Sequence, residues 1–509
     1  MGLRRRDVLK GGLAAGALLV VDSHPVLSAS LSTARGRGAE RRTALFPGVR
    51  LVHADLHNHS HLSDGTGDPF AFHAMVRGEG IDVAALTDHG VAGFGRRDFC
   101  APIPDAAGVE NPCRSLLGMT DAGWQTTLEL AAAANAPGRY AALPGFEWTS
   151  PHLGHMNVWF SEDWIDALST GGVTEEGLEQ IGVPLEVLEL LLRTEFAELI
   201  TDAEITDLIT AIRDQEPAGM RLFYDWLLRR PGTGELGGGG DGLVGFNHPN
   251  REPAVFDDFA YDERIADRTV SLELFNRRDD YLFRGLADGM PSPLVACLNA
   301  GWRVGIVGTT DEHGTEWGTE QGKGRTGVWL RGLQRRGVRD ALLDRRVFAT
   351  REPGLRLAAT ADGVPMGGTV PARRGRVSFA VDLDLGPERA GMPVAVQVLR
   401  PGTDVPEVAE VVSGEAARPD TRGPGDRPLR FDVQLDPDDG DWIVLRIADP
   451  ATSSDTPAPF DHPCNDWALA YSSPWWFGDP RPGRRRVPIT GRPRGRSIPD
   501  EPRWWLHQL

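Results

Sequence analysis

Short apolar runs alternate with segments of helical periodicity between residues 49 and 352. The helical segments are Pro69–Arg77, which begins with proline, the Ala- and Leu-rich Asp121–Ala134, and Val338–Arg345. Such strand-helix-strand alternation predicts an α/β fold with parallel strands. The predicted strands are Val52–His57, Val83–Leu86, Tyr140–Phe146, Leu243–Phe246, Val270–Leu274 and Val304–Gly308.

One segment inside this region has a different character. Residues 173–229 are rich in Glu, Leu and Ile at helical spacing and contain no His. We predict that they form a helical insertion or lid. Four consecutive glycines, Gly237–Gly240, form a flexible break before the strand pattern resumes.

The pattern changes again from residue 354. Val, Leu and Ala alternate with polar residues, Gly and Pro, as in Val377–Leu385, Val394–Leu399 and Trp442–Ile447. This pattern predicts a smaller all-β, sandwich-like domain over residues 354–475. The Arg- and Pro-rich residues 476–509 are predicted to be an extended tail.

Residues 1–30 have the pattern of an export signal. The basic segment Arg4–Lys10 precedes the apolar run Gly11–Val21 and the small residues Ser28–Ser30. The apolar run is too short to span a membrane, so we expect no transmembrane segment in the mature form.

The basic segment resembles a twin-arginine signal, because the pair Arg5-Arg6 is followed by one further residue and then Val8-Leu9-Lys10. An ordinary secretory signal with a basic start is the alternative. The resemblance implies the twin-arginine export machinery as a partner and a periplasmic, cell-surface or extracellular location. We expect cleavage between residues 27 and 40, and a linker over residues 31–48.

Composition and cysteine usage narrow the function classes. The chain has 509 residues, enough for two or more domains, and a formal net charge of −18. This acidic balance argues against nucleic acid as a partner. No CxxC pair is present, so a structural zinc site is not expected. Cys100 and Cys113 can close a short disulfide loop, whereas Cys297 lies in an apolar stretch and is interpreted as a buried small hydrophobe.

Histidines and acids recur beside the predicted strands. Because loops at the carboxyl ends of parallel strands share one face of the fold, six such segments are expected to meet there. In a strand-borne His-x-His, both rings also lie on the same side. The candidate metal ligands are His57, His59, Asp64, His89, Glu147, His155, His248, Asp311 and His313.

This ligand set suits divalent metals. Imidazole nitrogen and carboxylate oxygen together bind Zn, Mn or Fe, and the lack of a thiolate disfavours a soft-metal site. Nine donors exceed the need of one ion, so we expect two or three ions, with Glu147 or Asp311 bridging two of them.

Five histidines outside this set are interpreted as capping or hydrogen-bonding residues. Two of them, His61 and His152, adjoin candidate ligands and are the ones that can also contact substrate. These five histidines are His53, His61, His73, His152 and His462.

The ordered motifs carry a family resemblance. His57-Asn58-His59-Ser60, followed by Asp64-Gly65, resembles the first motif of the PHP superfamily (polymerase and histidinol phosphatase). The later motifs are similar to Ala85–His89, Gly145–Glu147 with Gly154–Asn157, Asn247–Pro249 and Thr310–His313. The resemblance spans residues 50–352 and is strongest to large stand-alone members of uncharacterised type.

The resemblance implies a distorted (β/α)7-type barrel over residues 49–352 and a trinuclear metal centre. Asp64 stands where some relatives have His, which implies a third metal site that is weaker or prefers a harder ion. Asp88 is expected to orient a ligand histidine. By position, the first metal is assigned to His57, His59, Glu147 and Asp311, the second to Glu147, His155 and His248, and the third to Asp64, His89 and His313.

The expected reaction is phosphoester hydrolysis of a small-molecule or polymer substrate by a metal-bridging hydroxide. Arg251 is the preferred phosphate clamp because a guanidinium binds oxyanions with two parallel hydrogen bonds. Arg277, Lys323 and Arg325 are weaker candidates. Two alternatives stay open: hydrolysis of a C–N or C–O bond by the same cluster, as in amidohydrolases, and a non-catalytic cell-surface binding protein on the same scaffold.

Overall fold

The structure is a computed structural model of the full chain. It describes residues 41–478, apart from 92–100, 105–109, 115–117, 196–200, 319–322, 372–374, 387–388, 418–427, 437–439, 455, 457 and 460. The predicted export signal, most of the linker, the tail from residue 479 and the predicted Cys100–Cys113 disulfide lie outside the described residues. Within the part that is described, no helix has the length and apolar character needed to cross a membrane.

Seven strands of the first 310 residues pair side by side, in the order β1–β2–β6–β7–β8–β9–β11. All run parallel except β7, which is antiparallel to both of its neighbours. Their residues are almost entirely buried, which explains why the sequence shows continuous apolar runs. The bounds are β1 Arg50–Asp55, β2 Val83–Leu86, β6 Ala141–Ser150, β7 Gly154–Trp159, β8 Leu243–Phe246, β9 Thr269–Asn276 and β11 Gly305–Thr309.

The segments that follow the first and last of these strands also pair with each other. Asn58 and Glu312 form a parallel bridge. The amide of Asp311 donates to the carbonyl of His57 at 3.0 Å, and the amide of His59 donates to the carbonyl of Glu312 at 2.9 Å. The two motif-bearing segments therefore lie side by side, although more than 250 residues separate them in sequence.

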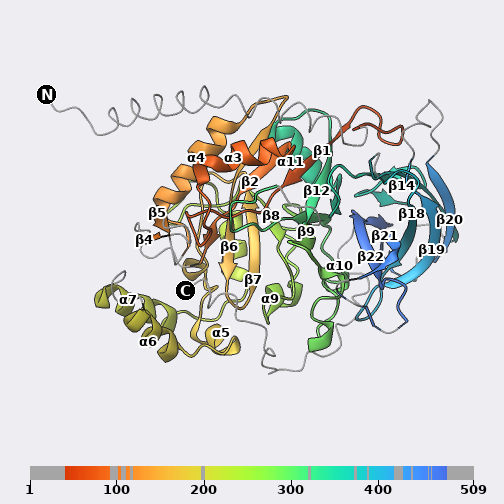
Figure 1. The fold of residues 1–509 in the computed structure, drawn as a ribbon. Coiled ribbons are helices and arrows are strands. Elements are labelled where there is room, and N and C mark those ends of the chain that lie inside the picture. Colours follow the sequence, from red (N-terminus) through yellow and green to blue (C-terminus); the bar gives the residue numbers. More distant parts are fainter. Residues whose placement is uncertain are drawn as a thin grey trace.

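Helices pack outside these strands. α3, Pro69–Gly78, begins with the cap Asp68 and Pro69, and α4, Asp121–Ala134, begins with the cap Thr120. α3, α4 and α11, Arg335–Leu343, lie together along one edge of the molecule (Figure 1).

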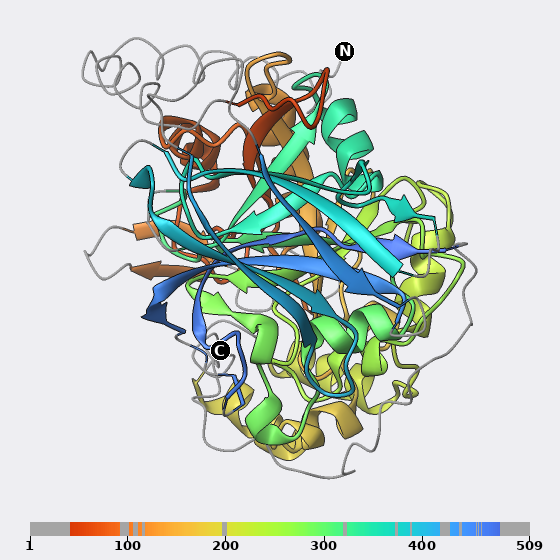
Figure 2. The ribbon, with the colours of Figure 1, turned by 90° about the vertical axis from the view of Figure 1, so that its right-hand side faces the viewer.

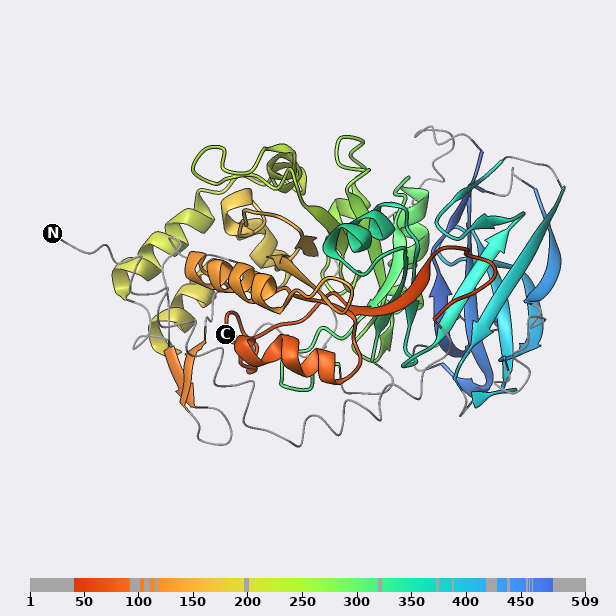
Figure 3. The same cartoon turned by 90° about the horizontal axis from the view of Figure 1, so that it is seen from above.

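The segment predicted as a helical insertion is helical. It contains α5 Glu175–Gln180, α6 Leu185–Glu195, α7 Asp202–Arg213 and α8 Arg221–Leu228. The ring of Phe223 in α8 stacks on Trp148 of β6, with centroids 4.4 Å apart. These helices lie on the side of the molecule away from the C-terminal strands (Figure 3).

The C-terminal region is all-β and has two sheets that share one hydrophobic core (Figure 2). Phe379 and Val381 from one sheet meet Val396 and Leu445 from the other. The first sheet contains β14 Arg356–Ala361, β15 Val364–Pro365, β17 Gly375–Asp384 and β20 Leu429–Leu435. The second contains β16 Thr369–Val370, β18 Pro393–Arg400, β19 Glu407–Glu415, β21 Trp442–Ser453, β22 Asp466–Ser472 and β23 Trp475–Phe477.

Backbone pairing continues from the first region into the second. β12, Arg325–Leu330, pairs with β1, and β13, Val347–Thr350, pairs with both β12 and β22. The change of composition at residue 354 is therefore not a break in hydrogen bonding.

A buried polar network also joins the two regions. Asp280, in the short strand β10 (Asp279–Asp280), accepts a hydrogen bond from the hydroxyl of Tyr471 at 2.8 Å. Arg446 donates to that hydroxyl at 3.0 Å, and the guanidinium of Arg351 lies 3.8 Å from the ring centroid of Trp467. The remaining short elements are β3 His89–Gly90, β4 Ala101–Pro104, β5 Glu110–Arg114, α9 Val255–Phe259 and α10 Pro293–Asn299.

Among the predicted strand ends that differ from the structure, two concern the site. β1 ends at Asp55, so His57 lies beyond the strand. β6 continues to Ser150, so Glu147 lies within the strand and does not follow it. The physical reason for the longer β6 is that β3 and β7 pair with its second half on either side.

Candidate metal centre

The structure brings all nine predicted ligands together, and Glu147 lies at their centre. The pairing of β6 with its two neighbours explains this position, because Glu147 lies opposite His89 in β3 and Asn157 in β7. Five histidine rings approach its carboxylate: His89 at 2.6 Å, His57 at 3.0 Å, His155 and His248 at 3.3 Å, and His59 at 3.7 Å.

The reversed strand β7 explains the position of His155 in the sequence. The other ligands lie late in a strand or beyond its end, whereas His155 is the second residue of β7 and precedes the apolar run. Because β7 runs antiparallel to its neighbours, its first residues lie at the carboxyl ends of β6 and β8. His155 therefore reaches the same place from the opposite chain direction.

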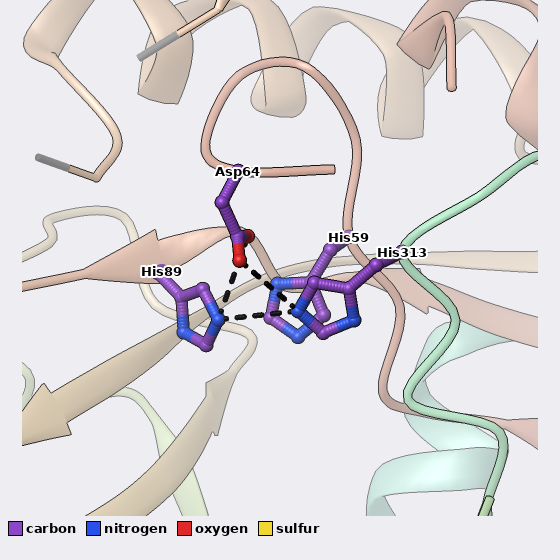
Figure 4. A group of neighbouring side chains, drawn as sticks. All are labelled: His59, Asp64, His89 and His313. Carbon is purple, nitrogen blue, oxygen red and sulfur yellow. Dashed lines mark hydrogen bonds and ion pairs between the residues drawn. The ribbon is translucent and has the colours of Figure 1, made fainter. Parts of the chain in front are cut away.

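One group of four residues forms the more open side of the centre (Figure 4). Asp64 lies on a loop, and its carboxylate lies 3.5 Å from the ring of His89 and 3.4 Å from the ring of His313. The Nε2 atoms of those two rings are 3.3 Å apart, and His59 stacks against both rings. Burial raises the pKa of Asp64, but the histidines outweigh it and hold that pKa at about 2. The resemblance assigned the third metal to three of these residues; His59 lies within reach of the same point.

A second group contains the residues assigned to the first metal. The Nε2 atoms of His57 and His59 are 3.0 Å apart, as expected for two rings on the same side. Asp311 Oδ1 lies 3.3 Å from His57 and 3.1 Å from His59. Asp311 has a positive φ of 47°, a left-handed conformation that Asp adopts more readily than most residues other than Gly.

The donors of this second group fit a divalent cation. His57 Nδ1 lies 2.9 Å from Glu273 Oε1, which can only accept, so the ring proton belongs on Nδ1. The lone pair of Nε2 then faces the carboxylates of Glu147 and Asp311 and the Nε2 atom of His59. Buried acceptors that face one another require positive charge between them, and a divalent cation supplies it.

In the metal-free protein, protons supply part of this positive charge. Burial lowers the pKa of His57, but Glu147 and Asp311 raise it well above the usual value. Burial also lowers the pKa of His89, but Asp64 and Glu147 raise it to about 9. Cation binding must therefore displace protons from these two rings.

Asp88 has a different role from the one expected. Its carboxylate accepts the amide of Ser60 at 2.8 Å and the hydroxyls of Ser60 and Ser63 at 2.9 and 2.7 Å. These hydrogen bonds hold the loop that carries Asp64 and do not orient a ligand ring. Burial raises the pKa of Asp88 to about 7 against the effect of these hydrogen bonds.

Among the four basic candidates, Arg251 and Arg277 reach the centre. Arg251 Nη1 lies 3.4 Å from Asp311 Oδ2, and its Nη2 donates to Tyr281 at 2.9 Å; its side chain is 12% exposed. Arg277 lies 3.3 Å from the same carboxylate, its Nη2 lies 3.1 Å from His313 Nδ1, and its side chain is 44% exposed. Arg251 is thus placed to position Asp311, and Arg277 is the better placed of the two to meet a ligand from solvent.

The other two basic candidates have structural partners. Lys323 pairs with Glu312, and Arg325 donates to the carbonyl of Gly318 at 2.5 Å.

Sequence reasoning missed three buried acids at the centre. Glu273 orients His57. Glu252 lies beside His155 and His248. Asp55 accepts hydrogen bonds from the amide and the hydroxyl of Thr310, at 3.1 and 2.6 Å. A signal for Glu273 was present, since it is a lone charge within a predicted apolar strand. Burial without a partner is costly, so such a residue points to a buried polar contact.

Three of the five remaining histidines make local contacts away from the ligands. His73 bonds the hydroxyl of Tyr140 at 2.8 Å, His462 bonds the carbonyl of Pro406 at 3.0 Å, and His53 is buried in β1. His152 packs against Gly177 of α5, where burial lowers its pKa to about 4. Cys297 is buried in α10, as predicted.

Comparison with known proteins gives likenesses to solved structures only. No family model and no curated protein match the sequence. A two-domain protein from Bacteroides vulgatus, containing a predicted PHP-like metal-dependent phosphoesterase, is 14% identical; the match covers 86% of this chain and 99% of that one, with a TM-score of 0.34.

Two further solved structures are similar over about half of the chain. A proposed metal-dependent phosphoesterase from Bifidobacterium adolescentis is 16% identical, with 52% of this chain and 88% of that chain covered and a TM-score of 0.26. An amidohydrolase from Chromobacterium violaceum, with bound sulfate and no metal, is 16% identical, with 51% and 87% covered and a TM-score of 0.24. At these TM-scores the likenesses are too weak to carry an argument about function.

Proposed function

We propose that the chain is an exported metal-dependent phosphoesterase whose centre holds two or three divalent ions. The observation that supports this function is the convergence of nine His, Asp and Glu side chains around the buried carboxylate of Glu147. We also propose that the seven paired strands, joined at their ends by the Asn58–Glu312 bridge, are the distorted barrel that the sequence motifs imply.

The ligand groups suggest how the ions are held. His57, His59 and Asp311 form one group, Glu147 with His155 and His248 a second, and His59, Asp64, His89 and His313 a third. Ions held there would act as Lewis acids and lower the pKa of bound water. Zn, Mn and Fe all accept this set of nitrogen and oxygen donors.

The residues around the centre favour a phosphoester substrate. His313, 20% exposed, and Arg277, 44% exposed, lie on the open side of the centre, whereas His57 and Glu147 are fully buried. A substrate therefore approaches beside Arg277. Its guanidinium can bind two phosphoryl oxygens with parallel hydrogen bonds and offset the charge that develops on them. Arg251 donates hydrogen bonds to the hydroxyl of Tyr281 and to the carboxylate of Asp311, and thereby positions Asp311.

The export component rests on the sequence of residues 1–30. Expression with the native N-terminus, followed by fractionation, tests it. Accumulation outside the cytoplasm that depends on Arg5 and Arg6 supports the twin-arginine route, and accumulation independent of both supports an ordinary secretory signal.

The experiment for the activity combines metal analysis with a substrate panel. We expect turnover of p-nitrophenyl phosphate or its bis ester, and we expect His57→Ala and Asp311→Ala each to abolish turnover and lower metal content. His462→Gln, which alters a histidine outside the ligand set that bonds the carbonyl of Pro406, is the control and should retain both. Turnover of amides or lactones without phosphoesters would contradict the proposal in favour of C–N or C–O hydrolysis.

A further inference from the structure

Glu252 is a buried acid beside the centre that belongs to none of the sequence motifs. We propose that it is a positioning residue: its carboxylate fixes the protons of His155 and His248 on the ring nitrogens that face away from Glu147. The inference rests on the metal centre proposed above, but it does not depend on phosphoester chemistry.

The two rings stand between two carboxylates. His155 places Nδ1 3.3 Å from Glu147 Oε1 and Nε2 3.7 Å from Glu252 Oε1. His248 places Nε2 3.3 Å from the same Glu147 oxygen and Nδ1 3.9 Å from the same Glu252 oxygen. The rings are 4.7 Å apart and inclined at 76°, so each presents one nitrogen to each acid.

This arrangement decides which nitrogen can bind a cation. A neutral imidazole has one N–H and one lone pair, and only the lone pair is a ligand. Glu147 also faces His57 and His89, so the cation belongs on its side. The charge of Glu252 attracts an N–H and repels a lone pair, so it favours the tautomer in which both lone pairs point toward Glu147.

Glu252 is suited to this effect by its burial. Its side chain is only 3% exposed, and its Oε1 atom has no hydrogen-bond partner among the described residues. Solvent therefore screens its charge little, and no competing donor in the described part of the chain occupies the oxygen that faces the rings.

The local backbone holds Glu252 against the start of β7. The amide of Ala254 donates to the carbonyl of His152 at 2.9 Å, and the amide of Phe256 donates to that of Leu153 at 2.5 Å. All four residues from Phe256 to Phe259 have φ between 52° and 56°, a left-handed turn that L-residues adopt at an energetic cost. Gly154 allows the close approach, because a Cβ there would lie 2.8 Å from the Phe256 ring.

The test compares zinc binding by Glu252→Ala, Glu252→Gln and the wild-type full chain in competition with a chelator. We expect Glu252→Ala to weaken one zinc ion by about 10–100-fold and leave the others unchanged, as for other outer carboxylates. Glu252→Gln should lose less, because the partial negative charge of its amide oxygen still favours an N–H on the facing ring nitrogens. Glu263→Gln, an exposed acid nearby, is the control.

Three results would overturn the proposal. Affinities of Glu252→Ala within about twofold of wild type would show that the carboxylate has no influence on the ligands. Equal and complete loss of one ion in both variants would make Glu252 a direct ligand. Uniform weakening of every ion, with a lower melting temperature of the metal-free protein, would make its role structural. If the zinc affinities change as expected but the protein hydrolyses no phosphoester, only the proposed function is refuted.

Discussion

Glu273 provides the sharpest test of how this centre is built. Its Oε1 accepts from His57 Nδ1 and from the hydroxyl of Thr309, each at 2.9 Å, and its Oε2 accepts from the amide of His248 and from Asn276, again at 2.9 Å. All four partners are donors, so both oxygens are fully used. Glu273→Gln keeps the shape and replaces one acceptor by an NH₂ group.

Neither orientation of the new amide satisfies these partners. If NH₂ replaces Oε2, it faces the N–H groups of His248 and Asn276, and each unmet buried donor costs roughly 1–3 kcal/mol. If NH₂ replaces Oε1, Thr309 can turn its hydroxyl, but His57 must accept at Nδ1. The ring proton then moves to Nε2, which removes the lone pair that faces the cation.

We therefore expect Glu273→Gln to lower zinc affinity about 10–100-fold at the group that contains His57. Isothermal titration against a competing chelator measures the affinity, and thermal unfolding of the metal-free protein measures the cost of the unmet donors. Glu263→Gln serves as the matched exposed control. A variant that binds zinc as tightly as wild type and unfolds at the same temperature would refute the assigned tautomer of His57.

Three further predictions concern other parts of the chain. Because the pKa of His89 is raised to about 9, the stability from its proton in the metal-free protein is complete below about 6.5 and is lost as pH rises through 9. Zinc must displace this proton, so the zinc-induced gain in melting temperature should grow between pH 6 and pH 9; a gain that shrinks would contradict this. Asp64→Asn should lower the metal content by one ion and leave the rest, as measured by elemental analysis; an unchanged count would remove Asp64 from the ligands. Tyr471→Phe should destabilise the chain by roughly 1–3 kcal/mol, because buried Asp280 loses a hydroxyl donor; chemical denaturation measures this, and an unchanged midpoint would argue against the network.

Much of the candidate centre could be predicted from sequence, because its ligands follow local patterns. Buried parallel strands produce apolar runs, and polar residues beside such runs share one face of the fold. That reasoning alone brought together His57, His89 and Asp311, which are far apart in the chain. The α/β class of the first region, the helices of 173–229 and the all-β character of the C-terminal region follow from the same periodicities.

The tertiary structure decided the features that depend on contacts between distant segments. Apolar periodicity does not encode strand direction, so only the structure shows that β7 is reversed and why His155 precedes its apolar run. The pairing of β6 with β3 and β7 extends that strand and buries Glu147 inside it. Arg251 and Arg277 both contact Asp311, and only the structure shows that Arg251 is the more buried of the two and donates to the hydroxyl of Tyr281.

The two acids outside the predicted ligand set, Glu273 and Glu252, show the same difference between what the sequence predicts and what the structure decides. Glu273 and Glu252 carry no motif, and each contacts a histidine from a distant segment: Glu273 contacts His57, and Glu252 lies beside His155. The sequence by itself determined which side chains are available to hold metal, because ligand type and strand periodicity are local properties. Only the tertiary structure determined which nitrogen of each ring faces the centre, because that choice depends on an acceptor brought from elsewhere in the chain.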